Sequence, residues 1–452
     1  MKKNKNTKNK VRKAKLKKIQ KKSISNKKRI RRKNRLRAER KPKNSILLSD
    51  TFISDWLVRA NPKCPFRFDA KSKMKFKIPA IFDIFKNPEV VLKEILKLNK
   101  ILLNRRLDYI TIDHRKLVKY GIGSEALLGL LATEIISNRR KQLDEKITLK
   151  GLYPAVQGAK QIVKSIGLAR ELEGDPFEDA TEHEHEENVH YFRYDNRYYN
   201  APSTRVNKKS EVAKECVRYL DDCMRSHNLS LKENSKNRLS ACLGEVLDNA
   251  EEHSGTNKSI WYVRGYFNNV KEERYLELSV FNLGNSIFDN FDNLPESSKI
   301  KKVASNYVMR HKGKIKEESL FTVAALQGDV STKKDSDPTR GQGSVTLIEN
   351  FESIYEEYCK LRKPNSLESI AEMNIISGGT VVHFDGKYKS VVEENKYGEE
   401  RFIMPFNELH SLNAPPDKRS VYTMNDVKFP GVMINIRMPL KGSTEPLDEV
   451  KK

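Results

Sequence analysis

The sequence predicts an α/β chain with two structured regions behind a charged arm, and three observations support this. Strand and helix patterns alternate between residues 65 and 172, which is typical of an α/β layer. Between residues 205 and 440, long apolar-periodic helical segments are combined with strands whose apolar residues have a period of two. Residues 1–45 hold too little apolar surface to fold alone.

The positive charge of the chain is concentrated in this N-terminal arm. Residues 1–45 contain 23 Lys or Arg and one acid, Glu39, a net charge of +22 out of +26 for all 452 residues, so the rest carries 26 − 22 = +4. Such an arm suits phosphate backbones and predicts salt-sensitive, nearly sequence-independent binding of DNA or RNA. A solvating tail is the alternative interpretation.

Composition also indicates the cellular compartment of the protein. No run of about 18 apolar residues occurs, and no apolar segment follows the basic start, so we expect neither a membrane span nor a secretory signal. Five scattered cysteines without metal-ligand spacing favour a reducing, cytoplasmic location.

The first structured region, residues 50–172, has three predicted strands, each followed by a predicted helix. The strands are 75–80, 109–113 and 147–152, and the helices are 90–103, 125–138 and 157–168. Residues 173–204 are predicted to be a linker. In its acidic part, His183, His185 and His190 match no compact metal site, so a solvated loop is expected.

A helix predicted around residues 235–250 carries the most informative pattern. Glu245 and Asn249 are four residues apart and share one helix face. A carboxylate beside an amide oxygen can orient a water and hold Mg²⁺, which are two requirements of phosphoryl chemistry on a nucleotide. Alone, the pattern also fits a solvated helix face.

Three further segments follow in order. A strand pair, 258–267 and 275–281, ends in Asn282-Leu283-Gly284-Asn285-Ser286. Glycines at 341 and 343 then open an apolar helix (345–351), where backbone N–H groups can approach a phosphate. Last, Ser377-Gly378-Gly379-Thr380 leads into a strand at 381–384.

This series resembles the ATP-binding domain of the Bergerat-fold (GHKL) ATPases, which include gyrase-type topoisomerases and histidine kinases. The resemblance covers residues 205–440, and it implies an α/β sandwich that binds ATP and Mg²⁺. It implies that Glu245 is the general base, that Asn249 binds Mg²⁺, that Asn282 reads adenine beside Gly284, and that Thr380 supports the base. Lid residues then wrap the phosphates: Lys333, Lys334, Arg340, Gly341 and Gly343. Two positions depart from the family pattern, because Asn282 replaces an aspartate and Ser286 replaces a glycine.

The first structured region resembles, less specifically, the STAS domain of anti-anti-sigma regulators. Its turn Gly121-Ile122-Gly123-Ser124 precedes a helix, and Ser124 falls near the serine that those regulators phosphorylate. A plain helix N-cap is the alternative role for Ser124.

Together these features predict a STAS-like domain (50–172), a linker (173–204), a GHKL-type domain (205–440) and a tail (441–452). The expected function is an ATP-gated ATPase switch in genome maintenance or defence, acting on nucleic acid through the arm. Two alternatives stay open: an anti-sigma-like serine kinase, with a protein partner at the STAS-like domain, and a non-hydrolysing ATP-gated adaptor. The GHKL resemblance also allows a homodimer. A sensor histidine kinase is disfavoured, since no phosphoacceptor-helix motif is found.

Overall fold

The chain divides into two compact units. The computed structural model describes residues 48, 52–63, 66, 71–168, 171, 185–186, 189–196, 208–225, 229–252, 254–255, 259–268, 275–328, 343–361, 371–394, 400–439 and 444–447. The first unit contains Met1–Leu47 and Leu103–Arg106. Its described part is a short turn in which the Asn104 Oδ1 accepts a hydrogen bond from the Arg106 N–H at 3.2 Å. The second unit, Leu48–Leu102 with Leu107–Lys452, contains the elements below.

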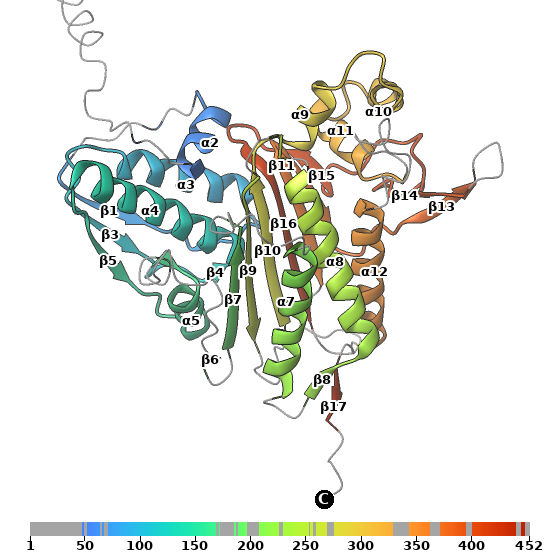
Figure 1. The fold of residues 1–452 in the computed structure, drawn as a ribbon. Coiled ribbons are helices and arrows are strands. Elements are labelled where there is room, and N and C mark those ends of the chain that lie inside the picture. The colour runs from blue at the N-terminus through green and yellow to red at the C-terminus, as the bar shows by residue number, and fades with distance from the viewer. Residues whose placement is uncertain are drawn as a thin grey trace, which may run out of the picture. The chain divides into compact units, whose positions relative to one another are not determined.

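An eight-stranded sheet forms the centre of this unit (Figure 1). Its order is β15-β12-β11-β16-β10-β9-β7-β6, and each pair of neighbouring strands is antiparallel. Strands β9, β10 and β11 are buried along nearly all of their length, which is expected of a sheet covered on both faces. The strands are β6 (His185–Glu186), β7 (Val189–Asp195), β9 (Trp261–Asn268), β10 (Tyr275–Leu283), β11 (Glu372–Gly378), β12 (Thr380–Phe384), β15 (Val421–Thr423) and β16 (Phe429–Pro439).

Three long helices cover one face of this sheet: α7 (Lys208–Arg225), α8 (Glu233–Glu252) and α12 (Gly343–Leu361). Each presents an apolar stripe to the sheet. On α8 the stripe includes Leu239, Leu243, Val246 and Leu247, which are all buried. These residues pack with the strands into the largest apolar core, and burial of this kind supplies most of the stability of a surface helix.

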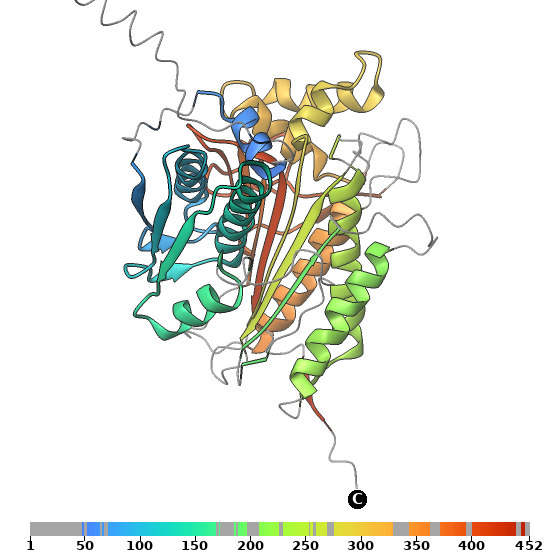
Figure 2. The same cartoon turned by 60° about the vertical axis from the view of Figure 1, so that its left-hand side comes forward.

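A parallel sheet with its own helices lies against the opposite face of the central sheet, as Figures 1 and 2 both show. Its strand order is β1-β3-β5, formed by β1 (Lys73–Lys77), β3 (Tyr109–Asp113) and β5 (Thr148–Leu152). The helices of this region are α2 (Phe52–Ala60), α3 (Pro88–Leu102), α4 (Ile122–Leu143) and α5 (Gln157–Ser165). Helices α2 and α4 contact the central sheet directly. The expected α/β class is therefore confirmed, with both parallel and antiparallel sheets.

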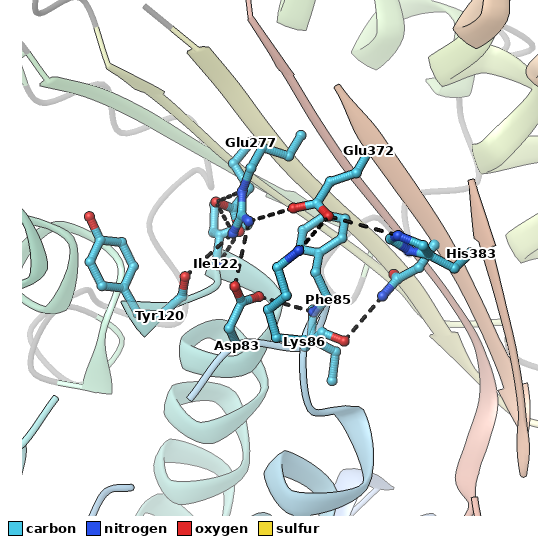
Figure 3. Close-up of polar contacts among 11 residues, drawn as sticks. Asp83, Phe85, Lys86, Tyr120, Ile122, Glu277, Glu372 and His383 are labelled. Carbon is cyan, nitrogen blue, oxygen red and sulfur yellow. Dashed lines mark hydrogen bonds and ion pairs between the residues drawn. The ribbon is translucent and has the colours of Figure 1, made fainter. Parts of the chain in front are cut away.

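Polar side chains join these two layers in a buried cluster around Arg437 (Figure 3). The Arg437 guanidinium donates to Glu277 at 3.1 Å and to Glu372 at 2.7 Å, and it lies 3.5 Å from Asp83. Glu277 also accepts a hydrogen bond at 2.6 Å from the backbone N–H of Ile122, in the first turn of α4. The carboxylate thus satisfies a helix N-terminus while it pairs with an arginine of the sheet.

Three acids therefore surround one buried guanidinium. Burial raises the pKa values of Asp83 and Glu277, while Arg437 opposes this rise. Lys86 lies 3.3 Å from Glu372, with a half-exposed side chain. Burial also lowers the pKa of His383, which faces Glu372. Burial therefore opposes ionisation of the Asp83 and Glu277 carboxyl groups, and the Arg437 guanidinium favours it.

Three short helices follow β10: α9 (Ile287–Asp292), α10 (Lys299–Arg310) and α11 (Glu317–Ala325). Ser286 begins α9 through a capping box with Asp289, and Ser298 caps α10 by accepting from the Lys301 N–H. Phe321 of α11 packs against Phe288 and Phe291 of α9, with ring centroids 5.6 and 5.7 Å apart. The remaining short strands are β2 (Ile81–Phe82), β4 (Lys119–Tyr120), β8 (Leu229–Leu231), β13 (Val391–Glu394), β14 (Glu400–Ile403) and β17 (Thr444–Pro446).

Two local expectations were wrong. The strand predicted at 75–80 is β1, which ends at Lys77 before Ile78 and Pro79. His190 does not lie in a solvated loop, because it is 4% exposed and stacks on Phe267 with centroids 5.7 Å apart. It belongs to β7, which pairs with β9 inside the segment expected to be a linker. His185 lies in β6, and His183 is outside the described residues.

Candidate nucleotide site

The polar face of α8 is formed by Glu245, Asp248 and Asn249, which are half-buried, whereas Val246, Leu247 and Ala250 of the same turns are buried. Helical periodicity therefore separates a core side from a polar side as the sequence predicted. Burial, with the Glu245 carboxylate adding to it, raises the pKa of Cys242 to about 12. The Cys242 thiol therefore stays protonated near neutral pH.

The end of β10 meets the end of α8. The Asn285 N–H donates to the Ser254 carbonyl at 2.8 Å. Gly284 has φ +147° and lies so close to Ser254 that a Cβ at position 284 would overlap the Ser254 carbonyl oxygen. Only glycine fits this approach of two backbones. The geometry brings the segment after Asn249 against the segment after Asn282.

Asn282 is the buried polar residue at this junction. It is 1% exposed, and its Nδ2 has no hydrogen-bond partner among the described residues. It faces the helix layer, since Leu278 and Val280 on the same side of β10 belong to the core beneath α8. An unsatisfied buried donor costs about 1–3 kcal/mol, so a ligand that accepts from it would recover this energy.

Asn282 begins a cross-strand row that runs through Val432 and Ser377 to Thr380. Three strand spacings of ~4.8 Å place Thr380 ~14 Å from Asn282. The direct cross-strand neighbours of Asn282 are thus Val432 of β16 and Trp261 of β9, and Ser377 lies one strand beyond Val432. Ser377 was not among the expected site residues, although the glycines that follow it marked the hairpin. Its Oγ accepts from the Ile287 N–H of α9 at 2.8 Å.

Thr380 is fully buried at the other end of this row. Its Oγ1 lies 3.1 Å from the Ser319 Oγ of α11, and Ser319 also bonds the Thr423 hydroxyl at 2.6 Å. Glu318 accepts from the Gly379 N–H at 2.6 Å and pairs with Lys428 at 2.9 Å. The first turn of α11 therefore holds the Gly378-Gly379 hairpin and Thr380.

The start of α12 completes the arrangement. Arg238 near the start of α8 pairs with Glu357 near the end of α12 at 2.6 Å, and the first turn of α8 shares an open groove with the last turn of α12. The two helices are consequently antiparallel. Gly343, the first residue of α12, then lies at the end of α8 that carries Asn249. A helix N-terminus at this point favours anions.

The other expected lid residues, Lys333, Lys334, Arg340 and Gly341, lie outside the described residues. The structure thus brings together α8 with Glu245 and Asn249, the end of β10 with Asn282 and Gly284, and the start of α12 with Gly343. Thr380 stands apart from Asn282 and contacts α11.

Ser124, the expected phosphoacceptor of the alternative kinase function, is fully buried in the first turn of α4. A Cβ on the neighbouring Gly123 would overlap Asn435 of the central sheet, so this turn lies tightly against β16. Phosphorylation of Ser124 would require α4 to leave the sheet.

No described helix is sufficiently long and apolar to cross a bilayer. Comparisons with protein-family models, with curated proteins and with solved structures gave no match.

Proposed function

We propose that the protein binds ATP with Mg²⁺ and acts as an ATP-gated switch of the GHKL type. The observation that carries the proposal is the junction of α8 with β10, where Ser254 and Gly284 bring the two elements into contact. Asn249 lies on α8, and the buried Asn282, whose Nδ2 has no partner among the described residues, lies on β10. Asn282 would read the base, because an amide can accept from the adenine amine and donate to the neighbouring ring nitrogen. A GHKL-type function assigns Mg²⁺ to Asn249 and water activation to Glu245.

Support for the phosphate end of the site comes from α12. Its N-terminus at Gly343 provides a partial positive charge beside the Asn249 end of α8. Mg²⁺, when bound, would neutralise phosphate charge there. In this proposal Thr380 couples the site to α11 through its hydrogen bond with Ser319. Nucleotide binding would then shift the α9–α11 helices, and a shift of these helices would change nucleotide binding.

We set this switch in a reducing compartment, the cytoplasm, with a nucleic acid partner for the cationic arm. The described cysteines Cys216, Cys242 and Cys359 are free thiols, in keeping with that choice. The burial of Ser124 weighs against the serine-kinase alternative.

The test is thermal stabilisation of the full chain by Mg·ATP. Ligand at 100 times its Kd stabilises a protein by about 2.7 kcal/mol. We expect this gain in wild type and in Asn237→Ala, which removes an exposed asparagine from the same helix, and its loss in Asn249→Ala. Equal stabilisation of both variants would remove Asn249 from the site. Incubation with γ-labelled ATP then separates an ATPase, which releases labelled phosphate, from a kinase, which labels protein, and from an adaptor, which does neither.

A further inference from the structure

The surface of α10 and its following turn carries a concentrated positive charge within the folded body. Residues 299–316 contain seven Lys or Arg and no acid, a net charge of 7 − 0 = +7. This exceeds the +4 net charge of all residues outside the arm, so the remainder of the body is net negative. The cations are Lys299, Lys301, Lys302, Arg310, Lys312, Lys314 and Lys316.

These charges lie on one exposed side. Lys299, Lys302, Val303, Asn306 and Arg310 follow helical spacing and are exposed, while the opposite stripe of α10 is buried in the core. Of the seven cations, Lys301 pairs with Glu296 at 2.6 Å. Within the described part of the chain, the other six form no ion pair with an acid. Here "the α10 face" denotes Lys299, Lys302, Asn306, Arg310, Lys312, Lys314 and Lys316.

The turn of the α10 face is held in shape by hydrogen bonds. His311 is buried, and its Nε2 bonds the Leu412 carbonyl at 3.0 Å. The Lys314 N–H donates to the His311 carbonyl at 3.0 Å, and Gly313 takes φ +81°. Arg310 bonds the Asn413 side chain, a neutral partner, at 3.0 Å. Because this backbone is already ordered, binding of an anionic partner costs less conformational entropy.

We propose that the α10 face binds the phosphate backbone of duplex nucleic acid. Lys302 and Arg310 are eight residues apart, so a rise of 1.5 Å per residue separates them by about 12 Å along the helix. That is roughly the width of the DNA major groove, so the two cations can reach phosphates on both of its edges. Asn306 lies midway between them on the same stripe. The site uses no residue of the N-terminal arm, and it does not require nucleotide to be bound.

Two other anionic partners fit the α10 face less well. A membrane-surface helix presents a broad apolar face with Trp, Phe or Leu. The exposed large apolar residues of α10 are only Val303 and Met309. Protein–protein interfaces are enriched in aromatic residues and depleted in lysine, whereas the exposed side of α10 carries lysines and its one aromatic residue, Tyr307, is buried.

The α9–α11 segment also links this face to the proposed nucleotide site. It begins at Ser286, directly after the Asn282–Gly284 strand end, and α11 bonds Thr380 through Ser319. A nucleic acid bound to α10 would therefore contact a segment that is joined to Asn282 and to Thr380, two of the expected nucleotide-binding residues.

Local protection of lysines tests the proposal in the full chain, without ATP. Lysines are acetylated with and without a 30-base-pair duplex of mixed sequence, and modification is measured by mass spectrometry. We expect at least a several-fold protection of Lys302, Lys312 and Lys314, and none at Lys146 and Lys150 of the β5 region. The arm contributes to total affinity but not to this local pattern.

Matched charge variants give the second measurement. One variant combines Lys302→Gln, Arg310→Gln and Lys312→Gln; the control combines Lys116→Gln, Lys146→Gln and Lys150→Gln, all exposed, for the same loss of net charge. Loss of three phosphate contacts should lower the log–log salt slope by about 2.7 in the first variant only. Equal slopes, or protection by anionic vesicles and not by duplex, would overturn the proposal. Failure of ATP to stabilise the wild type would not affect it.

Discussion

The Oγ of Ser319 lies 3.1 Å from the Oγ1 of Thr380, so α11 is bonded to the strand that follows the Gly378-Gly379 hairpin. Both hydroxyls are fully buried, and Thr423 completes the group at 2.6 Å from Ser319. A displacement of α11 or of β12 must therefore break these hydrogen bonds or move the other element with it. This contact joins α11, the helix that follows the α10 face in the chain, to Thr380, one of the expected nucleotide-binding residues.

Ser319→Ala should uncouple the two proposed sites. Wild-type affinity for duplex should change when Mg·ATP is added, by a factor of 5–150 if the coupling has the usual 1–3 kcal/mol. In the variant this factor should fall towards one, while each ligand still binds alone. The measurement is duplex affinity with and without Mg·ATP.

Thr322→Val is the control for this coupling. It removes another buried hydroxyl of α11, one that bonds the Glu318 carbonyl in its own helix at 2.9 Å. Coupling should survive in this variant. If both substitutions abolish coupling equally, general loosening of α11 explains the effect and the Ser319–Thr380 contact has no special role.

Asn282→Leu should weaken ATP binding without lowering the stability of the folded protein. The substitution replaces a buried amide whose Nδ2 has no partner among the described residues with an apolar side chain of similar size. We expect the free energy of unfolding without ligand to stay equal or to rise by about 1 kcal/mol. ATP affinity should fall, since the base-reading group is lost. Denaturation curves and ATP titration measure the two quantities. A variant that is less stable but binds ATP normally would show Asn282 to be a structural residue.

Glu245→Ala should retain ATP but lose hydrolysis, provided the wild type hydrolyses ATP. A general base contributes about two to four decades of rate. Glu233→Ala removes an exposed glutamate from the first turn of the same helix and should keep the wild-type rate. Phosphate release under single-turnover conditions is the appropriate measurement. Hydrolysis at the wild-type rate in Glu245→Ala would place the base elsewhere.

Local sequence signals predicted the elements of the site but not their spatial order. The periods of 3.6 and 2 marked α8 and β10 correctly, because apolar spacing depends only on neighbouring residues. The row from Asn282 to Thr380 depends on β16, which pairs with both β10 and β11 although it follows them by many residues. Pairing between such distant segments leaves no local signal, so the separation of Thr380 from Asn282 could not be foreseen.

The strand β7 was not predicted, because charged residues precede it in the sequence. The acidic residues around His185 suggested a loop, yet Tyr191 and Phe192 continue an apolar strand that pairs with β9. In α9 and α10, the signals were present as Ser286 with Asp289 and as Ser298, the serines that cap these helices. The α10 face was visible as a run of lysines, but only the fold shows that six of its cations lack acidic partners among the described residues.

Deletion of residues 1–45 should weaken nucleic-acid binding and leave ATP binding unchanged. The arm carries +22 of the net charge, and each lost phosphate contact lowers the log–log salt slope by about 0.7–0.9. Salt titrations on duplex and single strands compare the full chain with the deletion. If the full chain and the deletion have identical salt slopes, the arm is only a solvating tail. Residual duplex binding that disappears with the Lys302, Arg310 and Lys312 substitutions would come from the α10 face.

Asp83→Asn should make stability less sensitive to rising pH. Burial raises the pKa of Asp83 above its ordinary value of 3.8, so the folded state binds this proton more tightly than the unfolded state does. The resulting stabilisation is complete below pH 3.8 and is lost as pH rises through the raised value. Relative to wild type, the variant should therefore gain stability as pH rises above 3.8. The Phe85 N–H can still donate to the Asn side chain, and Arg437 keeps Glu277 and Glu372.

Asp417→Asn provides a control of opposite sign. Hydrogen bonds from the Arg419 N–H, the Tyr388 hydroxyl and Lys387 lower the pKa of Asp417 to about 2. Its stabilising contribution is present above pH 3.8 and is lost as pH falls towards 2, so this variant should lose stability relative to wild type as pH rises from 2 to 4. Chemical denaturation at closely spaced pH values gives both differences. If the Asp83→Asn difference does not change as pH rises above 3.8, Arg437 offsets the effect of burial on the pKa of Asp83.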